Sequence, residues 1–510
     1  MVKLNWERNI KPKDGIFNGS SENLELTKSE EVLYPSFIDN FKKNKNVIDS
    51  IKPNDLIDNS DNWINKLILG DNKTILKFLK RNFKDKIDLI YLDPPFFTHS
   101  YYYHKLFIGN HKKSIKNVAY NDKWKEGLDS YLNFLYERLM LMKHILSKRG
   151  SIYVHLDWHV SHYIKLIMDE IFGEENFRNE IIWHYPAASA RTKNFFVRSY
   201  DSILFYTKSD DYIFIDDPRI YMEYSNRVKD NLKKDAKGYY YNRGGSHDGV
   251  KLSQKVYVEN EGVFPRDVWI DIPYIRANTS EYQGFSTQKP ERLLKRIILA
   301  SSEKESIVAD FFMGSGTTLA VAEKLGRKWI GADLNWQSIH TTRKRLLNIA
   351  ETNDIYNWEE PYNQQARPFE IHFIEKKNLF KDFLKDFIPE GSEEKSSVLE
   401  KEFKIEIKII EKTDKIRIKL IDYQNPYEAL LSEKLLKKIK TWKDWIDYFA
   451  LDLKPQNESF IPYWVDFRTP KKRNIILDII FPVNSIISKK IKAKVIDILG
   501  VETIKKIDIN

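Results

Sequence analysis

The sequence of 510 residues contains no cysteine. This absence excludes disulfide bonds, thiolate metal sites and any reaction that needs a cysteine nucleophile. No run of 18 apolar residues occurs, and the first residues, Met1–Trp6, lack the apolar core of a signal peptide. Glycine (19) and proline (18) are scarce for this length, so a segment rich in either one stands out. We therefore expect a cytoplasmic protein that makes no contact with a membrane.

Charge and length further narrow the class of protein to which this chain can belong. Lysine and arginine (83) exceed aspartate and glutamate (73) by 10, which favours a polyanionic partner. Hydrophobic residues make up 42% of the chain, enough for globular packing, and the length predicts two or three domains.

The segment Asp93-Pro94-Pro95-Phe96 follows the apolar run Ile87–Leu92. A strand over this run places Asp93 at the carboxyl edge of a sheet, where α/β proteins bind ligands. The two prolines fix φ and remove two backbone donors, which leaves a carboxylate and carbonyls as acceptors beside an aromatic ring. Such a set suits a flat group that carries an NH2, such as a nucleobase. A stiffened turn with a core phenylalanine is the alternative.

A second apolar run, residues 306–313, is followed by Gly314-Ser315-Gly316-Thr317 and a helical pattern. Strand, glycine turn and helix form half of a nucleotide-binding unit, and Asp333 lies about 20 residues after the loop, where a carboxylate binds ribose hydroxyls. Leu319 replaces the third glycine of the dinucleotide fingerprint, and no P-loop occurs anywhere in the chain. With Asp310 just before the loop, a cationic or zwitterionic ligand such as S-adenosylmethionine fits better than a pyrophosphate.

Together these motifs resemble the amino-methylating DNA methyltransferases that use S-adenosylmethionine. The order of the motifs is similar to the β group, which includes the modification subunits of type III restriction systems. Leu67–Asp71, Gly150–Asp157 and Thr287–Pro290 resemble further family motifs, and the resemblance covers roughly residues 62–345. It implies catalytic roles for Asp93, Pro94, Pro95 and Phe96. It implies cofactor binding by Asp71, Thr287, Lys289, Pro290, Asp310, Phe312, Gly314, Ser315, Gly316, Thr317, Asp333 and Asn335, and no metal.

The chemistry expected is methylation of an exocyclic amine. Methylation of the cytosine ring carbon needs a thiolate, which this chain lacks. An amine needs only a lone pair aimed at the methyl group, on a nucleotide flipped out of the duplex. In the family an initial Asp accompanies mostly adenine, so Asp93 favours adenine. Methylation of the cytosine amine and a catalytically silent DNA-recognition subunit are the alternatives, and a dinucleotide dehydrogenase is disfavoured by Leu319.

Three other groups of residues allow two interpretations each. His155, Asp157 and His159 alternate like metal ligands, but no fourth ligand follows at a suitable spacing. Tyr101–His104 either stacks on bases or lies over the pocket, or else packs as an ordinary loop. Trp183 lies where the family supplies a second face for the flipped base, although core burial is the simpler interpretation.

The expected fold class is α/β, with a mostly parallel Rossmann-like sheet, an inserted target-recognition region and an α+β C-terminal domain. The expected divisions are an N-terminal extension (1–61), a first catalytic half (62–185), the insertion (186–283), a cofactor-binding half (284–350) and an accessory domain (355–510). In the last we expect a hairpin of Phe403–Ile410 and Lys415–Tyr423, a helix over Tyr427–Phe449 and a strand over Asn474–Phe481. The expected partner is double-stranded DNA in the bacterial nucleoid, with a homodimer and a restriction subunit from another polypeptide left open.

Overall fold

A computed structural model describes most of the chain. The described residues are 26–32, 63–110, 114–186, 192–247, 250–258, 262–374, 402–410, 414–428, 431–455, 459–486 and 490–509. The expected N-terminal extension therefore lies largely outside them. No helix in this part of the chain is long and apolar enough to cross a membrane.

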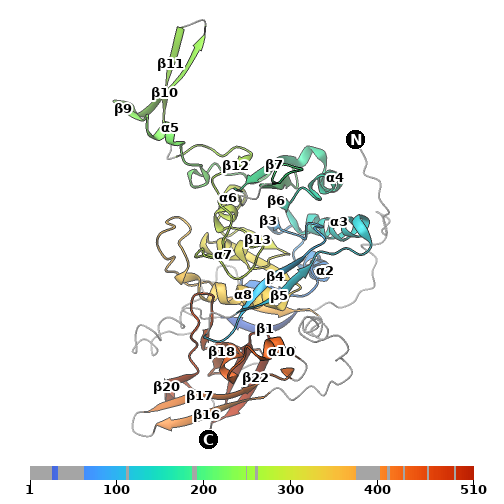
Figure 1. Cartoon of the computed structure of the whole chain (residues 1–510), viewed down its shortest axis with the longest axis vertical. Helices are drawn as coiled ribbons and strands as arrows, with labels where there is room; N and C mark the ends of the chain where they lie inside the picture. Colours follow the sequence, from blue (N-terminus) through green and yellow to red (C-terminus); the bar gives the residue numbers. More distant parts are fainter. Residues whose placement is uncertain are drawn as a thin grey trace.

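A large mixed sheet forms the centre of the molecule (Figure 1). Its order is β1 (Thr27–Val32), β15 (Phe369–Phe373), β2 (Asn65–Leu69), β14 (Lys328–Asp333), β13 (Ile307–Asp310), β3 (Ile87–Leu92), β6 (Leu146–Leu156), β8 (Tyr200–Thr207), β7 (Phe177–His184) and β12 (Val268–Trp269). The strands from β15 to β6 run parallel to their neighbours, whereas β1 and β8 pair antiparallel. The mostly parallel α/β sheet expected from the sequence is confirmed.

Helices cover both faces of this sheet (Figure 1). One layer contains α2 (Asn72–Asn82), α3 (Gly127–Ile145) and α4 (Ser161–Phe172), and the other contains α6 (Glu291–Ser301), α7 (Thr317–Lys324) and α8 (Trp336–Leu347). Side chains of β3 alternate between them: Leu89 and Tyr91 pack with the α6–α8 layer, and Ile90 and Leu92 with the α2–α4 layer. Because the strand is buried on both faces, its sequence is continuously apolar.

Two smaller β structures extend from the sheet. The hairpin of β4 (Tyr101–Phe107) and β5 (Ser114–Asn121) follows Asp93–Phe96, called the target motif from here on. A three-stranded sheet of β9 (Lys233–Asp235), β10 (Gly238–His247) and β11 (Val250–Tyr257), preceded by α5 (Asn226–Lys229), projects from the body of the molecule (Figure 1).

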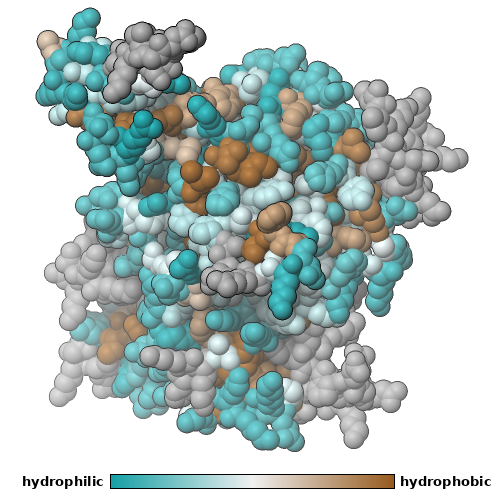
Figure 2. Space-filling model, turned by 45° about the horizontal axis from the view of Figure 1, so that its top comes forward, coloured by the Kyte–Doolittle hydropathy of each residue, from teal (hydrophilic) through white to brown (hydrophobic). Residues whose placement is uncertain are grey.

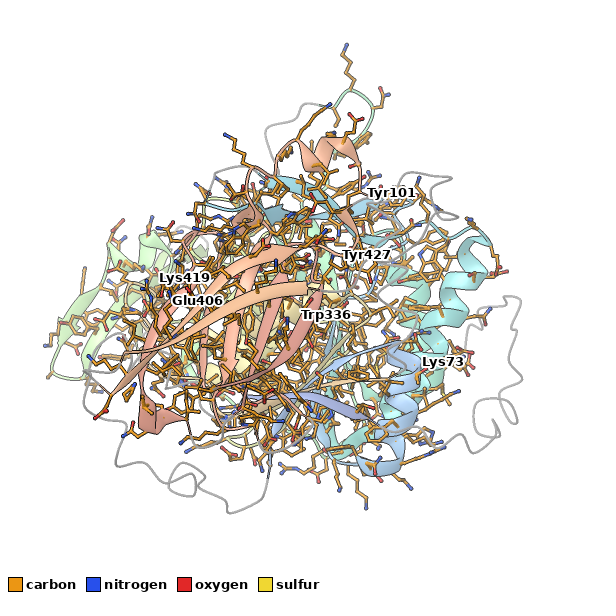
Figure 3. All side chains as sticks on the ribbon, turned by 90° about the horizontal axis from the view of Figure 1, so that it is seen from below. Lys73, Tyr101, Trp336, Glu406, Lys419 and Tyr427 are labelled. Atoms are coloured by element: carbon orange, nitrogen blue, oxygen red, sulfur yellow. The ribbon has the colours of Figure 1, made fainter. Side chains whose placement is uncertain are left out.

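The C-terminal part contains two antiparallel sheets around a separate core. The first is β16 (Glu402–Ile410), β17 (Lys415–Gln424) and β20 (Asp478–Pro482), and Figure 3 shows it from below, with Glu406 and Lys419 labelled on paired strands. The second is β19 (Trp464–Phe467), β18 (Ile446–Asp452), β21 (Lys490–Asp497) and β22 (Glu502–Asp508). The hairpin expected from the sequence is confirmed, and the last expected strand begins later, at Asp478.

The helix expected over Tyr427–Phe449 was wrong. Among the described residues of this segment, from 431 onwards, the structure contains the short helix α10 (Glu433–Leu436) and a 3-10 turn (Trp442–Asp444) before β18 begins at Ile446. All seven residues of β18 are buried, because the strand lies between β19 and β21. A strand buried on both faces lacks the alternation that distinguishes it from a helix.

The central sheet also crosses three of the expected divisions. β1 lies within residues 1–61, β8 lies within the expected insertion, and β15 lies beyond residue 355, yet all three are strands of the sheet. The part that leaves the sheet therefore starts after Thr207. β1 and β15 complete the edge beside β2, since β15 pairs with both of them.

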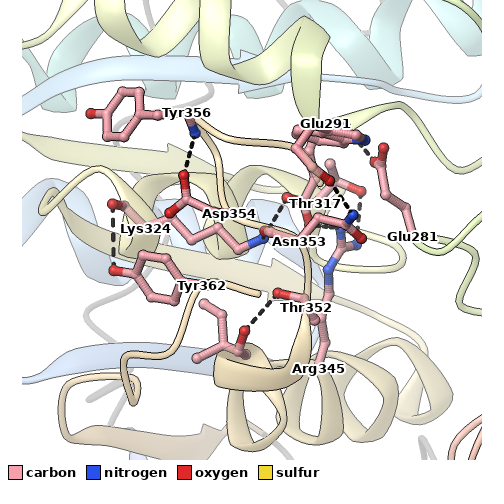
Figure 4. Close-up of polar contacts among 12 residues, drawn as sticks. Glu281, Glu291, Thr317, Lys324, Arg345, Thr352, Asn353, Asp354, Tyr356 and Tyr362 are labelled. Carbon is pink, nitrogen blue, oxygen red and sulfur yellow. Dashed lines mark hydrogen bonds and ion pairs between the residues drawn. The ribbon is translucent and has the colours of Figure 1, made fainter. Parts of the chain in front are cut away.

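A buried ionic network lies among α6, α7 and α8 (Figure 4). The Glu291 carboxylate accepts hydrogen bonds from Lys324 Nζ and Arg345 Nη2, both at 2.7 Å, and all three side chains are at most 2% exposed. Arg345 Nη1 also donates to Thr317 Oγ1 at 3.0 Å, in the first residue of α7. The network thus fixes the helix that begins directly after the glycine loop.

We predict that Glu291→Ala destabilises the protein by about 3–5 kcal/mol, because it leaves the Lys324 and Arg345 charges buried without their carboxylate. Denaturant unfolding of the full chain measures this change. In the control Glu433→Ala, an exposed pair with Lys437 is lost, and we expect a change of about 0.5 kcal/mol or less. An equal loss of unfolding free energy in the two variants would contradict the claim that burial makes the Glu291 ion pairs important.

Candidate active site

A cavity of about 720 Å³ opens at the carboxyl ends of β2, β3, β13 and β14. This is the edge at which open α/β sheets bind ligands. Twelve of the sixteen predicted site residues line it: Asp71, Asp93, Pro95, Thr287, Lys289, Asp310, Phe312, Gly314, Ser315, Thr317, Asp333 and Asn335. The target motif and the glycine loop, far apart in the sequence, therefore share one cavity.

The other four predicted residues lie beside the lining. Pro94 is buried in the turn after β3, and Pro290 caps the start of α6. Gly316 caps α7 with φ of +72°, and a Cβ there would lie 2.4 Å from Thr342 Oγ1, so only glycine fits. The Phe96 ring is partly buried and nearly parallel to the ring of His155, with centroids 6.1 Å apart.

The Asp93 carboxylate is bound by a lysine from the other half of the sheet. Lys289 Nζ lies 2.7 Å from Asp93 Oδ1 and 2.6 Å from Oδ2, and it also lies 5.2 Å from the centroid of the Phe96 ring. Both members of the pair are largely withdrawn from solvent, with side chains 19% and 11% exposed. Tyr131 Oη donates to the Pro95 carbonyl at 2.8 Å and holds the turn from α3.

A second carboxylate, Asp122, holds the loop that follows the target motif. It is fully buried and accepts hydrogen bonds from four donors: the backbone N–H groups of Phe97 and Thr98, Thr98 Oγ1 and Trp124 Nε1. Phe97 has φ of +60°, a region that bulky side chains rarely adopt. Asp122 therefore stabilises a strained backbone directly after Phe96.

Two acids line the cavity beside the glycine loop: Asp310 is buried and Asp333 is partly buried. Asp310 accepts from Phe312 N–H and Thr318 Oγ1, and Asp333 accepts from Gly314 N–H and Asn335 N–H. Burial raises the pKa of Asp310 to about 7, with a further upward contribution from the neighbouring carboxylates Asp93 and Asp333. Burial also raises the pKa of Asp333 to about 6. The cavity is thus short of positive charge.

At the end of β2, Asp71 caps α2 by accepting from Thr74 N–H, and Arg138 of α3 lies 2.8 Å from its other oxygen. Asn335 caps α8 and donates from Nδ2 to the Ala119 carbonyl of β5 at 2.7 Å. Two predicted site residues, Asp71 and Asn335, therefore also fix neighbouring elements.

Sequence reasoning missed most of the aromatic residues of this cavity. Tyr120, Trp124, Phe134 and Trp336 line it. They come from β5, the segment before α3, α3 itself and the start of α8, so only the folded chain brings them together. Tyr101 of β4 also lines the cavity, and the sequence had indicated it as a residue that could stack on bases. Tyr101 and Trp336 are labelled in Figure 3.

The alternatives left open by the sequence are largely decided by contacts. The His155 ring lies between Tyr91 Oη (2.8 Å) and the Asp201 carboxylate (3.0 Å), and His159 contacts Asp157. Within the described residues, no group of three or more His, Asp or Glu side chains is arranged to hold a metal ion. Trp183 is 3% exposed and donates from Nε1 to the Ile272 carbonyl, as the core interpretation expects.

The profile of the DNA methylase family (N6_N4_Mtase) matches residues 87–344, about half of the chain. The match starts at β3, which leads into the target motif, and ends in α8, after the glycine loop and Asp333. The chain belongs to the DNA methylase family.

Curated relatives agree with this assignment. The type II methyltransferase M.EcaI of Enterobacter cloacae is 31% identical over 337 residues, which cover 58% of this chain and 72% of the relative. The DNA adenine methyltransferase YhdJ of Escherichia coli K12 is 30% identical over 290 residues, 55% of this chain and 82% of the relative. The StyLTI Mod subunit, part of a type III restriction-modification enzyme of Salmonella typhimurium, is 25% identical over 336 residues, 53% of this chain and 51% of the relative.

We predict that Asp122→Ala lowers the methylation rate of this DNA methylase by about 10²-fold, because the loop after Phe96 loses three hydrogen bonds, Trp124 loses a fourth, and the target site shifts. Steady-state methylation assays measure the change, and cofactor affinity should stay within about twofold, since Asp122 does not line the cavity. Asp210→Ala, which removes an exposed carboxylate, is the control. A rate equal to that of the control would contradict the role.

Proposed function

We propose that this DNA methylase transfers a methyl group from S-adenosylmethionine to the exocyclic amine of an adenine that is flipped out of double-stranded DNA. The observation that carries the proposal is the shared cavity: the acidic target motif and the glycine loop open into one space. In that arrangement, a bound cofactor and a flipped base lie next to each other.

The lining of the cavity suits this cofactor. Asp71, Asp93, Asp310 and Asp333 are carboxylates, and Lys289 is the only lysine or arginine among the lining residues, all of which the structure describes. A phosphate-rich nucleotide would meet repulsion here, whereas a ligand with net positive charge is attracted. When bound, S-adenosylmethionine supplies an electrophilic methyl group on a positively charged sulfur. We assign its binding to the twelve predicted cofactor residues around β2, β13 and β14.

The target motif would position the base. Asp93 and the Pro94 carbonyl accept the two N–H bonds of the amine and leave its lone pair free to point at the methyl group. Such positioning supplies about 7–11 kcal/mol of the barrier reduction in well-oriented reactions. Asp93 also stabilises the positive charge that develops on the amine nitrogen, and it is placed to receive the proton. Phe96 stacks on the base, a contact worth roughly 1–3 kcal/mol.

Adenine is favoured over cytosine by the Asp that opens the motif and by the relative YhdJ, which is named a DNA adenine methyltransferase. The cytosine amine is the second candidate, since it presents the same NH2 group. Digestion of methylated DNA to nucleosides separates the two, because only one methylated base accumulates.

We assign sequence recognition to the part of the chain that leaves the sheet after Thr207. Its projecting sheet, β9–β11, carries basic side chains, and the coloured part of it in Figure 2 is mostly hydrophilic. The basic side chains are those of Lys233, Lys234, Lys237, Arg243 and Lys255. A two-stranded ribbon fits the major groove of DNA, and such charges bind its phosphates. From a DNA substrate we infer that the enzyme acts in the bacterial cytoplasm, at the nucleoid. A second copy of the chain and a separate restriction subunit remain candidate partners.

We predict that Asp93→Ala abolishes methylation while the protein still binds S-adenosylmethionine. The change removes the acceptor for the target amine but leaves the glycine loop intact. Long-read sequencing of DNA modified by each protein gives the methylated base and its sequence context. Methylation that persists in the variant would contradict the assignment of Asp93.

We also predict that cofactor binding releases protons near neutral pH. In the free protein the pKa of Asp310 is about 7, so this carboxyl is partly protonated there. A bound cation favours the ionised form and lowers this pKa, so the affinity should fall by about tenfold as the pH drops from 8 to 6. Calorimetry in two buffers of different ionisation enthalpy measures the protons, and Asp310→Asn should remove most of the release. Cofactor binding without proton release at pH 7 would contradict the predicted coupling between Asp310 ionisation and binding.

A further inference from the structure

Lys289 lies between the two halves of the cavity. Its side chain reaches the Asp93 carboxylate of the target motif, at 2.6 and 2.7 Å. Its backbone carbonyl accepts a hydrogen bond from Thr317 Oγ1, the first residue of the helix after the glycine loop, at 3.2 Å. One residue is therefore attached to the target motif and to the cofactor loop at the same time.

The Asp93 carboxylate and the carboxylate of a bound ligand would compete for the ammonium group of Lys289. Asp93 is one of four carboxylates in the lining, and Lys289 is the only lysine or arginine there among the described residues. A ligand with an amino-acid end brings a further carboxylate into the cavity, and Lys289 is the one ammonium group present to pair with it. The flexible four-carbon stem of lysine lets the ammonium group change partners without a movement of the backbone.

We propose that Lys289 is shared between Asp93 and the carboxylate of the bound cofactor, so that cofactor binding frees Asp93 to accept the target amine. The proposal rests on the proposed function, and it adds that the cofactor site controls the target site. Before the cofactor binds, Lys289 holds both oxygens of Asp93. After it binds, the ammonium group turns to the new carboxylate, and Asp93 becomes an available acceptor.

The reaction gives a physical reason for such an exchange. The amine nitrogen gains positive charge as it is methylated, and an ammonium group fixed on Asp93 would oppose that charge at close range. A lysine that leaves only when the cofactor is present confines the active form of Asp93 to the loaded enzyme. Since coupling is reciprocal, a base held by Asp93 should in turn strengthen the binding of the cofactor by Lys289.

Binding calorimetry on the full-length protein tests the exchange without DNA. The two probes are S-adenosylhomocysteine, which carries the amino-acid end but no sulfonium charge, and 5′-methylthioadenosine, which lacks the amino-acid end. Comparing them isolates the effect of the carboxylate, since attraction between Asp93 and a sulfonium group is absent from both. The proteins are the wild type, Asp93→Asn, Lys289→Met and the double variant, which together form a double-mutant cycle.

We expect Asp93→Asn to bind S-adenosylhomocysteine about fivefold to tenfold more tightly, because Lys289 loses its competing partner. Lys289→Met should bind it about tenfold more weakly, and Asp93→Asn should have no effect in the Lys289→Met background. Binding of methylthioadenosine should stay within about twofold throughout. Asp211→Asn, which removes an exposed carboxylate that lies beside Arg149, is the control for the loss of one negative charge and should bind both probes as the wild type does.

Unchanged or weaker binding of S-adenosylhomocysteine by Asp93→Asn would overturn the exchange, and so would an equal gain in the Lys289→Met background. Either result leaves the proposed function intact, provided that the wild type binds both probes. If the wild type binds neither probe, the proposed function itself fails, and the exchange fails with it. Thermal unfolding of each variant separates lost binding from lost folding.

Discussion

The adjacency of β3 and β13 is the constraint on which the site depends. The two strands are parallel neighbours, with Leu89 opposite Val308, so Asp93 and Asp310 emerge at the same edge of the sheet. A strand end is a rigid support, and both supports belong to one sheet buried under helices on each face. The relative placement of Asp93 and Asp310 is therefore set by backbone hydrogen bonds between strands and does not depend on flexible loops.

This arrangement has an electrostatic cost. Burial raises the pKa of both Asp310 and Asp333 above the usual range for aspartate, and the Asp93 carboxylate raises that of Asp310 further. In a cavity with a single lysine, the ionised forms are poorly compensated before a ligand binds. Such uncompensated groups are typical of functional sites, because a ligand of opposite charge gains what the empty protein lacks. The same shortage of positive charge makes Lys289 a contested partner.

The chemistry-bearing part of the site was predictable, since it follows short apolar strands at fixed spacing. Asp93, Gly314 and Asp333 each lie at a strand end or in the turn that follows it, and the sequence pattern indicates such positions directly. Asp122 and Arg138 were not predictable, because their partners lie across the fold and no local pattern marks them. The buried strand β18 was mistaken for a helix for a related reason: its pairing with β19 and β21 comes from distant segments.

The C-terminal part bears on the cavity through α8. This helix begins at Trp336, which lines the cavity, and its buried face contacts the C-terminal sheets. His340 and Lys344 both contact the Asp447 carboxylate of β18. Gly500, with φ of +81°, lies so close that a Cβ there would be 2.3 Å from Trp336 Cδ1.

A second set of contacts reaches α8 from both ends of the chain. Glu30 of β1 pairs with Lys494 of β21 at 2.7 Å and with Arg343 of α8 at 3.4 Å, and all three side chains are fully buried. Glu502 of β22 lies 3.3 Å from Lys494 and 3.8 Å from Arg343, so removing Glu30 would leave two buried cations with only this more distant carboxylate. Such a loss is strongly destabilising. The N-terminal strand, the C-terminal sheets and the helix that begins at the cavity are thereby held as one unit. Although none of the described residues beyond 374 lines the cavity, the C-terminal part fixes the helix whose first turn forms part of that lining.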